Sequence, residues 1–129
     1  MKPNLLASLQ AALEHHHAGR LAEAEQLYRA VLRDDAGDAD ALNLLAVLEY
    51  QRGQNLEALE GLSKAIRVSP KTAIFHNNLG LVLVALGRHE EAAQRFEQAV
   101  RLDARLRDAF HNLGVARQKL GEMDQAIAA

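Results

Sequence analysis

The fold of this chain is decided by residues 75–102, which read FHNNLGLVLVALGRHEEAAQRFEQAVRL. Apolar residues recur at helical spacing up to Leu86, Gly87 and Arg88 interrupt the pattern, and apolar residues from Ala92 onward resume it. Because glycine adopts positive backbone angles without strain, Gly87 can end one helix and let the next begin within a few residues. The stretch therefore predicts two antiparallel helices joined by a tight turn.

The same pattern returns along the chain with a period of 34 residues. Each turn glycine is followed five positions later by an alanine, where a larger side chain would hold the two helices apart, and then by a large residue at a core-facing position. A fixed period of this length is typical of stacked helical hairpins, which bury their apolar faces against their neighbours. The recurring positions are Gly19, Gly53, Gly87 and Gly121; Ala24, Ala58, Ala92 and Ala126; and Tyr28, Leu62 and Phe96.

This register predicts one domain over residues 1–129, made of units 5–38, 39–72, 73–106 and a truncated unit 107–129. Each of the recurring glycines is expected to form a turn, so a short last helix is expected to begin anew after Gly121. The expected helices are residues 4–18, 21–34, 38–51, 55–68, 72–85, 89–102, 106–119 and 123–129.

Composition supports an all-α fold and excludes several classes of partner. The chain is 49% hydrophobic but only 4% aromatic, with two prolines and no tryptophan, which favours helix over sheet. A net charge of -2, from 15 basic and 17 acidic residues mixed along the chain, provides no basic surface for nucleic acid. The absence of cysteine excludes disulfides and thiolate chemistry, and no run approaches the roughly 18–20 apolar residues that a membrane span needs. We therefore expect a cytoplasmic protein that binds neither nucleic acid nor membranes.

No motif for catalysis, cofactor binding or metal binding stands out. The sequence has no glycine-rich phosphate loop and no nucleophile elbow. His15, His16 and His17 are consecutive, so on a helix they point about 100° apart and cannot hold one metal ion as an i, i+4 pair could. We interpret them as solvated helix residues, and we expect no enzyme activity, no cofactor and no metal site.

The order of these residues resembles the tetratricopeptide repeat. The pairs Leu45-Ala46, Leu79-Gly80 and Leu113-Gly114 stand in the first helices, followed by the recurring glycine, alanine and large residue, and Pro70 closes the second unit. The resemblance implies an all-α, right-handed superhelical solenoid of antiparallel helix hairpins with about three and a half units. It also implies a non-catalytic protein-interaction module whose first helices line a concave groove for a peptide or helix of a partner protein. The groove residues that the resemblance implies here are Leu9, Leu13, Asn43, Val47, Tyr50, Asn77, Asn78, Leu81, His111, Asn112 and Val115.

Two groups within this groove are informative. Asn78 and Asn112 stand where O-linked N-acetylglucosamine transferases carry an asparagine ladder that holds a peptide backbone; alternatively, each amide hydrogen-bonds an adjacent helix. An apolar column forms either an exposed groove floor or a contact with the next unit's first helix. The column consists of Leu13, Val47, Leu81 and Val115.

The resemblance also separates this chain from some relatives. Relatives that clamp the acidic C-termini of heat-shock chaperones use Lys, Arg and Asn on three first helices, whereas the matching positions here hold Leu9, Leu13 and Leu44. We therefore expect no such carboxylate clamp. Arrays similar to this one are often joined to a glycosyltransferase, sulfotransferase or methyltransferase domain, so the alternative function is an N-terminal substrate-docking region of a larger transferase.

The C-terminal end of the array is expected to be uncapped. The short last helix lacks the large core residue, which leaves Leu113, Ala116 and Leu120 of the preceding helix uncovered. Two explanations stay open: the chain is a fragment of a longer protein, or two copies form a homodimer by covering each other's C-terminal ends.

Overall fold

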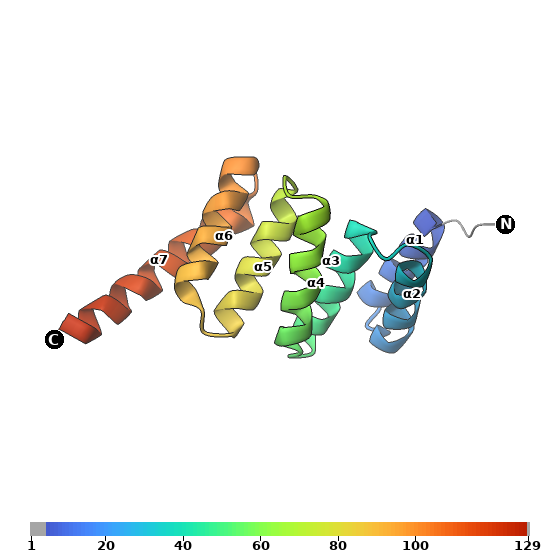
Figure 1. Cartoon of the computed structure of the whole chain (residues 1–129). Coiled ribbons are helices and arrows are strands. Elements are labelled where there is room, and N and C mark those ends of the chain that lie inside the picture. Colours follow the sequence, from blue (N-terminus) through green and yellow to red (C-terminus); the bar gives the residue numbers. More distant parts are fainter. Residues whose placement is uncertain (1–4, 129) are drawn as a thin grey trace. The chain divides into compact units, whose positions relative to one another are not determined.

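The computed structural model describes residues 5–128, which form helices joined by short loops and contain no strand (Figure 1). The helices are α1 (Leu5–His17), α2 (Leu21–Asp34), α3 (Ala39–Gln51), α4 (Asn55–Val68), α5 (Ala73–Ala85), α6 (His89–Leu102) and α7 (Arg107–Ala128). The all-α prediction is confirmed, and the first six helices begin and end within one residue of the predicted bounds.

The chain divides into two compact units, one ending at Ser69 and the other beginning at Pro70. In the N-terminal unit, α1 packs on α2, α2 on α3, and α3 on α4. In the C-terminal unit, α5 packs on α6, α6 on α7, and α5 also touches α7. No helix within residues 5–128 is both long enough and apolar enough to cross a bilayer.

Three of the recurring glycines form the predicted turns. Gly19, Gly53 and Gly87 have φ values of 81°, 79° and 78°. In the third turn the Gly87 N–H donates to the Val84 carbonyl at 2.9 Å, and the Arg88 N–H donates to the Leu83 carbonyl at 2.8 Å. These bonds satisfy carbonyl groups that the end of a helix would otherwise leave without partners. Glycine is needed here because the left-handed backbone conformation strains residues that carry a Cβ.

The prediction of a fourth turn is wrong. α7 runs through Gly121 as one helix to Ala128, so no separate helix over residues 123–129 begins after it, and residue 129 lies outside the described part of the chain (Figure 1). A glycine inside a helix costs about 1 kcal/mol relative to alanine, whereas a turn interrupts several backbone hydrogen bonds. In the third hairpin that cost is offset because Ala92, Phe96 and Ala99 are buried. Residues 121–127 are all exposed, so no burial offsets the cost of a turn at Gly121 in the described part of the chain.

The core follows the recurring positions. Ala24, Ala58 and Ala92 are completely buried, as expected for residues at the contact between the two helices of a hairpin. In the C-terminal unit the closest approach is between Gly80 of α5 and Phe96 of α6, since a Cβ added to Gly80 would lie 2.6 Å from Cδ1 of the ring. The N-terminal core cluster consists of Leu9, Ala12, Ala24, Tyr28, Val31, Ala41, Leu45 and Leu48.

His16 is not the solvated residue that the sequence suggested. Its Nδ1 lies 2.9 Å from the hydroxyl of Tyr28 on α2, and its Nε2 lies 2.6 Å from Oε1 of Gln51 on α3. An amide oxygen only accepts, so Nε2 donates to Gln51 and Nδ1 accepts from the tyrosine hydroxyl. His16 therefore links three helices of the N-terminal unit. Tyr28 is fully buried, and burial raises its pKa to about 12.

Candidate functional site

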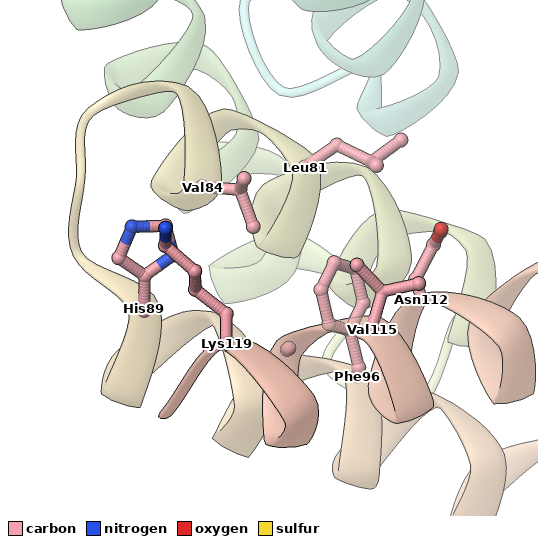
Figure 2. A pocket seen from close by; sticks show the side chains of 8 residues that line it. Leu81, Val84, His89, Phe96, Asn112, Val115 and Lys119 are labelled. Atoms are coloured by element: carbon pink, nitrogen blue, oxygen red, sulfur yellow. The ribbon is translucent and has the colours of Figure 1, made fainter. Parts of the chain in front are cut away.

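A hollow of about 320 Å³ opens in the C-terminal unit between α5, α6 and α7 (Figure 2). Its walls come from the first helices of the hairpins, with Leu81 and Val84 on α5 and Val115 on α7, while the Phe96 ring of α6 lies deeper. Val84 and Val115 are 38% and 52% exposed, so apolar surface is accessible at its mouth. The lining residues are Leu81, Val84, His89, Phe96, Asn112, Val115, Ala116 and Lys119.

The hollow combines an apolar interior with basic side chains at one edge. Figure 2 shows His89 and Lys119 on the same side of the space, away from Leu81 and Asn112. An apolar cavity with a few placed polar groups suits an apolar side chain whose neighbour carries a complementary charge. Lys119 provides a positive charge for such a group.

A second hollow, of about 580 Å³, lies in the N-terminal unit. Leu13 of α1 and Leu44 and Val47 of α3 supply its apolar surface. Polar side chains also line this hollow, among them His16 and Gln51, which are hydrogen-bonded to each other. The lining residues are Leu13, His16, His17, Gly19, Leu21, Leu44, Val47 and Gln51.

The apolar column lies at the surface of both hollows. Leu13 and Val47 line the N-terminal hollow, and Leu81 and Val115 line the C-terminal one. None of these four residues is fully buried. Within each unit the residues of the column thus form part of an open surface and are not fully covered by a neighbouring helix.

The asparagines behave differently. Nδ2 of Asn112 donates to Oδ1 of Asn77 at 3.0 Å, which joins α7 to α5 within the C-terminal unit. This bond matches the alternative in which the amide holds an adjacent helix. Asn78 is half-buried and also interacts within the chain.

The remaining predicted groove residues are scattered. Leu9, Asn43 and Asn77 are buried, so a ligand cannot reach their side chains without a rearrangement. Tyr50 is half-buried and His111 is exposed, and neither lines one of the two hollows.

The sequence argument missed His89, Phe96 and Lys119 as lining residues of the C-terminal hollow. His89 and Phe96 lie on α6, the second helix of its hairpin, whereas the predicted groove residues all lie on first helices. Lys119 follows Val115 by four residues on α7, so the helical period could have placed it on the same face.

A network of charges joins α2 to the end of α3. Glu25 accepts from Arg29 at 2.9 Å and from Arg52 at 2.5 Å, and the bond from Arg29, followed by the one from Arg52, lowers the Glu25 pKa. Glu49 is only 7% exposed, and its Oε2 lies 3.9 Å from Nη2 of Arg29. Burial raises the Glu49 pKa. None of these side chains lines a hollow, and their contacts are explained by helix packing.

Within residues 5–128, no group of three His, Cys, Asp or Glu side chains is arranged to hold an ion. His15, next to His16, accepts a hydrogen bond from Nε of Arg20 at 2.8 Å.

Comparison with known proteins establishes the family. The family model of the tetratricopeptide repeat matches residues 37–105, more than half of the chain. The chain belongs to the tetratricopeptide repeat family, and its recurring glycine, alanine and large residues are the repeat's own positions.

Solved structures share the fold. The first TPR domain of Spaghetti (RPAP3), solved with an HSP90 peptide, superposes with a TM-score of 0.86 at 18% identity, covering 91% of this chain and 93% of that one. The O-GlcNAc transferase of Thermobaculum terrenum superposes with a TM-score of 0.79 at 30% identity, covering 90% of this chain but 23% of that one.

A curated relative is similar over a shorter range. Cellulose synthase operon protein C of Komagataeibacter xylinus is 36% identical over 64 residues, which is 50% of this chain. The match spans only 5% of that much longer protein.

Proposed function

We propose that each unit of this chain binds a short segment of a partner protein in the hollow on its first-helix face. The family and the fold make the chain a protein-interaction module. What supports the finer proposal is one observation: the same column positions line an accessible, largely apolar hollow in each unit. Exposed contiguous apolar surface on a folded domain commonly marks a contact site.

The C-terminal hollow suggests the chemistry of the segment. Its volume of about 320 Å³ suits one or two apolar side chains. Lys119 at its edge favours a carboxylate next to the apolar anchor. The Spaghetti domain was solved with an acidic HSP90 peptide, but Leu9, Leu13 and Leu44 here lack the polar groups of a carboxylate clamp. We infer that binding depends on an apolar anchor inside the segment, with an acidic neighbour, and not on a terminal carboxylate.

A displayed library of random peptides tests this proposal. Selection on the wild-type chain should enrich peptides with a large aliphatic or aromatic residue next to Asp or Glu. The Val115→Asp variant should lose most affinity for the selected peptides, because it places a carboxylate in the apolar wall and opposes the acidic neighbour. Amidation of a peptide's C-terminus should leave its affinity unchanged.

Val68 offers a matched control for that variant. Val68 is 54% exposed on α4, against 52% for Val115, and lines neither hollow. Val68→Asp should therefore keep the affinity of the wild-type chain. If both aspartate variants bind the selected peptides as the wild type does, the C-terminal hollow is not the binding site.

A second candidate function is a substrate-docking region of a larger transferase. It is favoured by the 30% identity to the Thermobaculum terrenum O-GlcNAc transferase over 90% of this chain. Docking by an asparagine ladder would require the Asn112 amide to exchange its bond to Asn77 for one to a peptide backbone. The test is the reading frame in the genome: a transferase domain encoded in the same frame would support this candidate, and a stop codon directly after Ala129 would exclude it.

A further inference from the structure

Two faces of α7 contact the rest of the C-terminal unit or line its hollow, and a third is largely exposed in the described part of the chain. One face is buried in the C-terminal unit through Ala109, Leu113 and Ala116, so the expectation that Leu113 and Ala116 would be uncovered is wrong. A second lines the C-terminal hollow through Asn112, Val115 and Lys119. The third, which we call the open face, carries exposed residues spaced by three or four positions, so that they share one side of the helix. The open face consists of Phe110, Gly114, Arg117 and Gly121.

α5 shows what occupies this face elsewhere in the unit. The residues 34 positions before Phe110, Gly114 and Arg117 are His76, Gly80 and Leu83, all buried, whereas the counterpart of Gly121 is the turn residue Gly87. Nδ1 of His76 lies 3.4 Å from Nη1 of Arg95 on α6, and the Phe96 ring lies against Gly80. On α5, therefore, the equivalent face is covered by an antiparallel helix.

On α7, Nη2 of Arg117 lies 3.9 Å from Oε2 of Glu97 on α6, and no described helix packs over the rest of the open face. A Cβ added to Gly114 or Gly121 would meet no atom within 4 Å, and Phe110 is 49% exposed. Neither glycine has a positive φ, so neither is needed for a turn, and each weakens the helix that contains it. The open face thus leaves room for close approach by another helix and presents a large aromatic side chain beside that room.

We propose that the occupant is the α7 of a second copy of this chain, docked antiparallel about a two-fold axis between Gly114 and Arg117. In this register Phe110 lies over Gly121 of the partner subunit, which fills the space that the missing Cβ leaves. Arg107 then faces Asp124 of the partner subunit. Because the interface is isologous, each of these contacts occurs twice.

Charge and shape both select the antiparallel arrangement. α7 begins with a basic residue, Arg107, and carries an acidic one, Asp124, near its end. Two antiparallel copies pair these charges, whereas two parallel copies place Arg107 against Arg107. A parallel pair would also stack Phe110 on Phe110 and leave both glycine positions empty.

Sedimentation velocity over protein concentrations up to about 1 mM measures the association. The wild-type chain should form a concentration-dependent dimer. Gly121→Leu should be monomeric, because its side chain fills the place of Phe110 from the partner. Leucine also favours helix over glycine, so circular dichroism should show α7 intact and a folding defect cannot explain the loss. Glu122→Leu adds the same side chain one residue along, off the open face, and should dimerise as the wild type does.

Phe110 and the charges supply independent readouts. Phe110→Ala should raise the dimer dissociation constant by about 30-fold or more, as for a central aromatic anchor. Arg107→Glu and Asp124→Arg should each weaken the dimer, and the double variant should restore it, because the exchanged charges again face each other.

Cross-linking tests the register, since the sequence contains no cysteine. Under mild oxidation, an equal mixture of Gly114→Cys and Arg117→Cys chains should form a mixed disulfide dimer faster than either chain alone. A faster dimer from Gly114→Cys alone would overturn the antiparallel register. A wild-type chain that stays monomeric at all concentrations, or a Gly121→Leu chain that dimerises normally, would overturn the proposal and assign the open face to a different helix.

Discussion

Replacing Gly80 by alanine should destabilise the protein, although alanine is the better helix former. The added Cβ would lie 2.6 Å from Cδ1 and 2.8 Å from Cζ of Phe96, closer than carbon atoms approach without bonding. Phe96 is 1% exposed, so its ring can shift only by displacing packed neighbours or by entering the C-terminal hollow that it lines. Overpacking of this kind costs about 1–3 kcal/mol, and the helix gains about 1 kcal/mol from replacing glycine. We expect a net loss of up to about 2 kcal/mol in the free energy of unfolding.

Gly114 provides the control, because it occupies the same repeat position on α7. A Cβ on Gly114 meets nothing within 4 Å, so Gly114→Ala should raise the free energy of unfolding by about 0.5–1 kcal/mol. The same substitution at equivalent positions is thus expected to have opposite signs. Urea denaturation followed by circular dichroism measures both free energies.

The second repeat suggests a rescue. It carries Ala46 and Leu62 where the third carries Gly80 and Phe96, and both residues are fully buried. The double variant Gly80→Ala, Phe96→Leu transfers this pair into the third hairpin. It should be more stable than the two single effects predict when added together. If Gly80→Ala and Gly114→Ala change stability by the same amount, the argument from the Phe96 contact is refuted.

Three further predictions concern polar groups in the protein interior. Burial raises the Glu49 pKa, so ionisation is disfavoured in the folded state and the free energy of unfolding falls as pH rises above about 4. Glu49→Gln should remove that fall and raise the free energy of unfolding at neutral pH. Chemical denaturation at several pH values measures both effects. Burial raises the Tyr28 pKa from 10.0 to about 12, so the neutral side chain's contribution to the free energy of unfolding is complete below pH 10. About 2–3 kcal/mol of that free energy should be lost as pH rises through 12. Tyrosinate absorbance in a Tyr50→Phe background reports the ionisation of Tyr28, and a midpoint at the ordinary tyrosine pKa would contradict the effect of burial. Asn112→Ala removes the donor to the buried Oδ1 of Asn77 and should cost about 1–2 kcal/mol by urea denaturation, whereas no change would mean that this bond contributes nothing.

Most of the fold could be predicted because it depends on local patterns. The helix bounds follow from apolar periodicity, and the turns at Gly19, Gly53 and Gly87 follow from glycine's access to positive φ. Gly121 has the same spacing and precedes the same recurring alanine, yet it is helical. The difference is not local: the turn at Gly87 is followed by a helix that buries Phe96, whereas residues 121–127 are all exposed.

The candidate site could be predicted only in part. The spacing placed Leu81 and Val115 on the same column, and the structure puts both in one hollow. It could not show that the Asn112 amide reaches Asn77, because that bond depends on the separation of α5 and α7. Similarly, three consecutive histidines gave no sign that His16 would contact two other helices.

The contrast between the column and the asparagines explains why the proposed ligand is an apolar segment. An amide that already bonds a neighbouring helix must lose that bond before it can bind a peptide backbone, so the net gain from the exchange is small. Binding at Val115 breaks no hydrogen bond, since its exposed surface contacts only solvent until a ligand covers it. The free energy available for binding in the C-terminal hollow is therefore concentrated in burial of apolar surface, with Lys119 at the edge selecting the charge of the neighbouring residue. A partner whose affinity falls modestly as salt screens Lys119 but falls sharply when its apolar residue is shortened would have the energetics that this arrangement implies.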